Sequence, residues 1–161
     1  MRAPLALALL LTAAVCAGAT PGALMRAAQN DELLVMVGVD LEVVEFRQSC
    51  IVLIMVIEAE NRDPFAPFGC VYVQSKNELN LFSLDGDYLV SELQLKLRNI
   101  DGVAQQETPV MSQLQIFTGN RRIAIHAQGK VWLDRKKTQA AYKWLIDHSV
   151  PARAPVPWIG P

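Results

Sequence analysis

The segment LVSELQLKLR (residues 89–98) decides the fold class of this chain. Four leucines recur at its odd-numbered positions, and mainly polar or charged residues stand between them. A period of two places alternate side chains on opposite faces of a β-strand. The segment therefore predicts a strand with one face in a core and the other in solvent.

Similar short runs occur on both sides of this segment and are expected to be strands: 37–43, 51–59, 70–74, 79–84, 111–117 and 123–133. Asp85-Gly86, Asp101-Gly102 and Gly119-Asn120 are turn signals, and two prolines mark a loop at residues 61–69. We expect a mainly β fold, an antiparallel β-sandwich or open barrel of about seven to eight short strands.

One C-terminal helix completes the expected fold. Ala141, Tyr142, Leu145 and Ile146 recur at helical spacing, and Thr138 is the expected N-cap. The 161 residues suit one domain. We divide them into a signal peptide (1–19), a lead-in segment (20–34), a single β-rich domain (35–150) and an extended Pro-rich tail (151–161). Residues 20–30 of the lead-in are expected to be flexible or weakly helical.

The first residues, MRAPLALALLLTAAVCAGA, have the layout of a secretory signal peptide. Arg2 precedes an apolar run, and small residues stand before the expected cut near Ala19. We therefore expect a secreted or periplasmic protein. An uncleaved membrane anchor and lipidation of Cys16 remain alternatives.

Cys50 and Cys70 remain after removal of the leader, and an exported protein with two cysteines invites a disulfide. Each of them begins an apparent strand. In a plain hairpin, two strand starts would lie about 30 Å apart, whereas the Cα atoms of bridged cysteines lie within about 7 Å. For this reason the sequence does not decide whether Cys50 and Cys70 form a disulfide.

The net charge of −1 conceals a segregation of charge along the chain. Residues 20–107 hold six basic and fourteen acidic residues, whereas residues 108–161 hold eight basic and two acidic ones. Aromatic residues stand among the basic side chains, which suits an acidic glycan, a lipid headgroup at a membrane surface or another polyanion; a nucleic acid is not favoured. Neutralisation by the acidic strands is the competing interpretation. The candidate anion-binding residues are Arg121, Arg122, Lys130, Arg135, Lys136, Lys137 and Lys143.

The sequence offers little for catalysis. It has no G-x-S-x-G motif, and no two Cys or His residues of the mature chain lie close enough to form a zinc-ligand pair. No catalytic residue, metal or cofactor is predicted. A small hydrolase that uses the carboxylate pair Glu58 and Glu60 is kept as a third hypothesis.

The leading hypothesis is an exported, non-enzymatic binding or accessory protein of the cell envelope or extracellular space, acting through protein–protein contacts. Phe65, Phe68 and Trp158 are its candidate partner contacts, because exposed large apolar groups often mark interfaces. Packing of the two phenylalanines in the core is the alternative. The oligomeric state is not predicted.

Two short segments, EAENRDPF (residues 58–65) and IAIHAQGKVWL (residues 123–133), resemble the WHy/late-embryogenesis β-sandwich domains. Asn61-Arg62-Asp63 stands where those domains have Asn-Pro-Asn. The resemblance transfers no functional residue and assigns no family.

Overall fold

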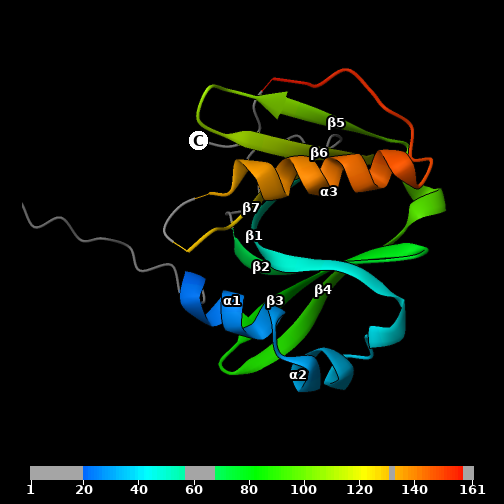
Figure 1. The fold of residues 1–161 in the computed structure, drawn as a ribbon. Helices are drawn as coiled ribbons and strands as arrows, with labels where there is room; N and C mark the ends of the chain where they lie inside the picture. Colours follow the sequence, from blue (N-terminus) through cyan, green and yellow to red (C-terminus); the bar gives the residue numbers. More distant parts are fainter. Residues whose placement is uncertain (1–19, 57–67, 131–132, 158–161) are drawn as a thin grey trace, which may run out of the picture.

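A computed structural model describes residues 20–56, 68–130 and 133–157 (Figure 1). Seven antiparallel strands in this part of the chain form one open sheet in the order β4-β3-β2-β1-β7-β6-β5. The expected mainly β fold is confirmed, and the sheet does not close. The strands are β1 (Val44–Val56), β2 (Phe68–Ser75), β3 (Glu78–Asp85), β4 (Tyr88–Lys96), β5 (Gly102–Glu107), β6 (Ser112–Thr118) and β7 (Arg121–Ala127).

Helices lie against both faces of the sheet (Figure 1). The C-terminal helix α3 (Arg135–Asp147) packs on β5, β6 and β7. On the other face, α1 (Pro21–Ala28) packs on β1 and β2, and α2 (Asp31–Met36) follows it. Two 3₁₀ turns, η1 (Leu41–Val43) and η2 (Leu97–Asn99), precede β1 and follow β4.

The alternation of side chains along the strands separates two main apolar clusters. Tyr72 of β2 is fully buried in the larger cluster with Ala141 and Leu145 of α3. Its neighbours Val71 and Val73 point to the opposite face and pack with Leu24 of α1. Burial of large apolar side chains on both faces supplies the main driving force for this fold.

The N-terminal segment differs from the expectation of a flexible or weakly helical lead-in. Residues 21–36 form α1 and α2, and Leu24 and Leu34 are fully buried. The expected strand at residues 37–43 is wrong, because this segment is a connection that ends in η1. Its alternating apolar residues, among them Val37 and Val39, pack against the cluster of α1 and α2.

Helix α3 begins earlier than predicted. Asp134, not Thr138, is the N-cap, and its carboxylate accepts a hydrogen bond from the backbone N–H of Lys137 at 3.0 Å. Thr138 is buried inside the first turns, where its hydroxyl accepts from the N–H of Ala127 and donates to the carbonyl oxygen of Asp134. A carboxylate cap also suits the positive end of the helix dipole.

The described part of the Pro-rich tail, residues 151–157, begins beside β5. Val103 donates its N–H to the carbonyl oxygen of Pro151, and Arg153 donates its N–H to the carbonyl oxygen of Val103, both at 2.8 Å. The tail therefore covers part of the sheet edge that β5 would otherwise expose.

Candidate partner-binding surface

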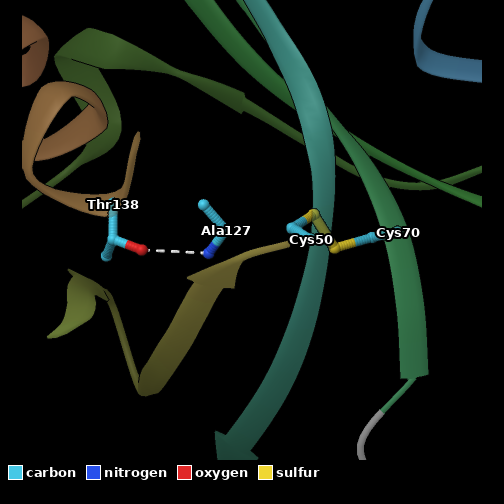
Figure 2. The surroundings of a disulfide bond; sticks show 4 residues. All are labelled: Cys50, Cys70, Ala127 and Thr138. Carbon is cyan, nitrogen blue, oxygen red and sulfur yellow. Dashed lines mark hydrogen bonds between the residues drawn. A yellow bond between two sulfur atoms is a disulfide. The ribbon is translucent and has the colours of Figure 1, made fainter. Parts of the chain in front are cut away.

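The disulfide joins Cys50 of β1 to Cys70 of β2 (Figure 2). The two residues are direct partners in the strand register, with Cα atoms 4.9 Å apart, and both side chains are fully buried. The obstacle expected from the sequence does not arise, because β1 begins at Val44 and Cys50 lies in its middle. The bond crosslinks two central strands of the sheet.

The seven candidate anion-binding residues are divided between several places. Arg121 and Arg122 begin β7, whereas Lys130 lies beyond the other end of that strand. A strand of this length separates its ends by about 20 Å. Lys136 and Lys137 are exposed in the first turn of α3.

Two of the seven cations already have acidic partners. Arg135 lies 2.9 Å from a carboxylate oxygen of Glu107, and Lys143 lies 2.6 Å from one of Asp147, a turn further along α3. The pKa of Glu107 is lowered by a hydrogen bond from Gln139 and by Arg135. The structure therefore does not gather the predicted set around one point.

Of the predicted partner contacts, Phe68 begins β2, is half-buried and packs against the larger apolar cluster. Phe65 and Trp158 lie outside the described residues, as do Glu58 and Glu60 and the expected signal peptide. In the described ranges no group of three or more His, Cys, Asp or Glu could hold a metal ion. None of the described helices has the length and apolar character of a membrane span.

A hollow of about 360 Å³ lies where α2, η1 and the start of β1 meet. It is lined by Asp31, Leu41, Val44, Glu45, Phe46 and Arg47. An ion pair of 2.6 Å between Arg47 and Asp31 joins β1 to α2 beside this hollow.

Exposed apolar side chains lie on the elements that line this hollow. Val35 and Met36 at the end of α2 are 56% and 65% exposed, and Val43 of η1 is 42% exposed. Leu34 already fills the buried side of α2, so the two residues that follow it are left in solvent. α2 and η1 contact each other, which places these side chains on neighbouring elements.

Exposed acidic residues lie close to these apolar residues in the sequence. Residues 30–46 carry five acidic residues and no lysine or arginine. Glu32, Asp40 and Glu42 are exposed and belong to α2, the connection after it and η1. We call Val35, Met36 and Val43, together with these three acidic residues, the acid-rimmed apolar surface.

Sequence reasoning missed the acid-rimmed apolar surface because it assigned residues 37–43 to a strand. One signal was present, since all of its acidic residues belong to the strongly acidic part of the chain. What the sequence could not show is that α2 and η1 would contact each other and leave their apolar residues outside the core.

Comparisons with known proteins give no family. No family model matches the chain, and no curated protein matches it. Among solved structures, it is similar to the Vav1 exchange factor with its PH and C1 domains (TM-score 0.46, 11% identity), covering 80% of this chain and 32% of that one. The hSac2 domain of human phosphoinositide phosphatase Sac2 gives a TM-score of 0.45 at 10% identity, over 88% of this chain and 98% of that one. The chain thus spans about a third of the length of the Vav1 structure, and no family is assigned to it.

Proposed function

We propose that this chain is an exported, non-enzymatic binding protein of the cell envelope or extracellular space that holds a protein partner on the acid-rimmed apolar surface. The exposure of Val35 and Met36, side by side on α2, is the observation that carries this proposal. Exposed apolar groups rimmed by polar ones often mark interaction sites.

The charge of the surface suggests the chemistry of the partner. Glu32, Asp40 and Glu42 flank the apolar side chains, and the lone nearby cation among the described residues of α2 to β1, Arg47, is already paired with Asp31. A partner segment with apolar residues on one side and lysine or arginine beside them would bury Val35 and Met36 and meet these carboxylates. Such a segment is a basic amphipathic helix or strand.

Two features support export. The leader MRAPLALALLLTAAVCAGA has the layout of a signal peptide. The buried Cys50–Cys70 disulfide is a bond that oxidising compartments maintain and reducing ones do not.

The test uses site-specific photo-crosslinking in the cells that produce the protein. A photo-reactive residue at Val35 or Met36 is expected to capture one defined protein, identified by mass spectrometry. Val90 and Val110 are matched control sites, since they are exposed apolar residues of β4 and of the β5–β6 connection. The captured partner, once purified, is titrated against the full chain and against the variant Val35→Asp/Met36→Asp.

We expect the double variant to bind at least about tenfold more weakly, because it loses the central apolar contact. Glu32→Lys/Glu42→Lys should chiefly slow association, since rim charges act on the encounter. Equal crosslinking at the control sites, or capture of a second copy of this chain alone, would contradict the proposal.

A further inference from the structure

A second cavity, of about 420 Å³, lies at one end of the sheet, beside the C-terminal end of α3. Four elements contribute to its wall: the turn between β2 and β3, the first residue of β3, the end of β4 with η2, and the residue after α3. The residues of the wall are Lys76, Asn77, Glu78, Lys96, Leu97, Arg98 and His148.

The backbone brings these elements together independently of any ligand. Glu78 and Lys96 are register partners at the end of the β3–β4 ladder, and the N–H of Leu97 donates to the carbonyl oxygen of Asn77 at 2.9 Å. His148 stacks on Trp144 with ring centroids 3.7 Å apart, and its Nε2 lies 3.1 Å from Glu45. The β3–β4 register, the Leu97–Asn77 hydrogen bond and the contacts of His148 therefore position the wall of the cavity.

The cations of this cavity form no ion pair with the described residues. Lys76, Lys96 and Arg98 are exposed, and none of the three side chains forms an ion pair or hydrogen bond with another described residue. Glu78 is the one carboxylate among the described residues of the wall, and its two oxygens accept hydrogen bonds from the amides of Asn80 and Gln94. Three cationic residues and one carboxylate thus line the cavity, so positive charge predominates in its described wall.

Three of the described arginines and lysines elsewhere form ion pairs. Arg47, Arg135 and Lys143 each form an ion pair. Holding three unpaired cations around one cavity is unfavourable by Coulomb repulsion, and an anion placed between them would reverse the sign of that energy. The guanidinium of Arg98 offers a fork of donors that fits two oxygens of an oxyanion, and the two ammonium groups add point charges.

From this arrangement we propose that the cavity lined by Lys76, Lys96 and Arg98 binds a small molecule that carries one or more phosphate groups. Its volume falls in the range of small-molecule sites. Leu97 gives the wall an apolar part, which suits a ligand with a carbon skeleton as well as phosphate oxygens. The cavity lies apart from the basic residues that the sequence alone singled out in the C-terminal part of the chain.

The proposal is tested by isothermal titration calorimetry of the full mature chain with inorganic pyrophosphate and with fructose 1,6-bisphosphate, at constant ionic strength. We expect saturable binding of at least one of them. Lys76→Gln/Arg98→Gln should weaken it about tenfold or more, because the double variant loses two of the three charge-assisted contacts to the phosphate oxygens. Arg98→Lys should cause a smaller loss, since it keeps the charge and removes the fork.

The matched control is Lys136→Gln/Lys137→Gln, which removes the same charge from exposed positions at the start of α3. It should leave the affinity unchanged. An equal loss in the control, or no saturable binding of either probe at millimolar concentration, would overturn the proposal. Thermal unfolding of each variant checks the fold, and a stronger response to the ester than to pyrophosphate would identify an organic phosphate as the ligand.

Discussion

Gln115 of β6 and Val156 of the tail are joined by two hydrogen bonds. The N–H of Val156 donates to Oε1 of Gln115 at 3.0 Å, and Nε2 of Gln115 donates to the carbonyl oxygen of Val156 at 3.2 Å. Nε2 also lies 2.9 Å from Oε1 of Gln113, a second fully buried amide. The side-chain amide of Gln115 thus pairs with the backbone of Val156 as a neighbouring strand would. These bonds anchor the tail to β6.

Replacement of Gln115 by Glu should release the tail. A carboxylate cannot donate to the carbonyl oxygen of Val156 or to Gln113, and its charge would be buried. We expect a loss of about 1–3 kcal/mol in the free energy of unfolding and faster hydrogen exchange at the amide of Val156. Gln106→Ala is the control, since this neighbouring side chain on β5 makes no hydrogen bond with the described residues. Unchanged exchange at Val156 in Gln115→Glu would contradict the anchoring role.

Gly102 allows the tail to pass over the start of β5. A Cβ at this position would lie 2.3 Å from Cδ and 2.4 Å from Cγ of Arg153, whose guanidinium sits 5.0 Å from the ring centre of Phe117. Gly102→Ala should therefore displace Arg153 and weaken the docking of the tail. In Gly102→Ala/Arg153→Ala the clashing atoms are absent, so the two changes should couple by about 0.5–3 kcal/mol in a double-mutant cycle of unfolding free energies. Additive changes in the unfolding free energy would show that the Arg153 side chain does not pass over Gly102.

The sequence predicts those parts of this fold in which local pattern and tertiary packing agree. The alternation in residues 89–98 gives β4, and helical spacing gives α3. The start of β1 was hidden because Gln48, a polar residue that is 5% exposed, occupies a position where the pattern would require an apolar one. Ser49, which is 3% exposed, is a second buried polar residue of this stretch. Placing the start of the strand after both residues produced the false obstacle to the disulfide.

Short helices and composite sites escape prediction for a different reason. α1 and α2 have eight and six residues, lengths at which an isolated helix is marginal, so their stability depends on contacts such as the burial of Leu24 on the sheet. Lys76, Lys96 and Arg98 stand on separate elements and become neighbours of one cavity through the register of β3 and β4. Sequence order alone does not give that register.

Removal of the disulfide should destabilise the chain without changing the fold. The bond closes a loop of 20 residues, for which the chain-entropy estimate is about 3 kcal/mol. We expect Cys50→Ala/Cys70→Ala to lose stability of that order in urea unfolding. Both sulfurs are inaccessible in the folded state, so a reductant should break the bond only in the unfolded chain. The wild type should therefore reach the lower stability of the double variant only when it is unfolded in the presence of a reductant. Equal unfolding free energies for the oxidised wild type and the double variant would contradict a stabilising role.

His126 should give the stability of the chain a pH dependence of predictable sign. Burial lowers the pKa of His126 from its ordinary value of 6.5, against an opposing hydrogen bond to the carbonyl oxygen of Ser112. The unfolded chain therefore takes up this proton near pH 6.5, whereas the folded chain takes it up only at a lower pH. Between the two pKa values the unfolded state binds more protons, so the free energy of unfolding decreases as the pH falls through this window.

The variant His126→Gln isolates this contribution, because every other titrating group is shared with the wild type. Urea unfolding from about pH 7.5 to about pH 5 should give a flatter profile for the variant, by about 1.4 kcal/mol for each unit by which the pKa of His126 is lowered. The variant is expected to be the less stable protein at the upper end of this range, where neutral His126 keeps its bond to Ser112. Parallel profiles would mean that His126 takes up its proton equally in both states, and burial would then not be the force that sets its pKa.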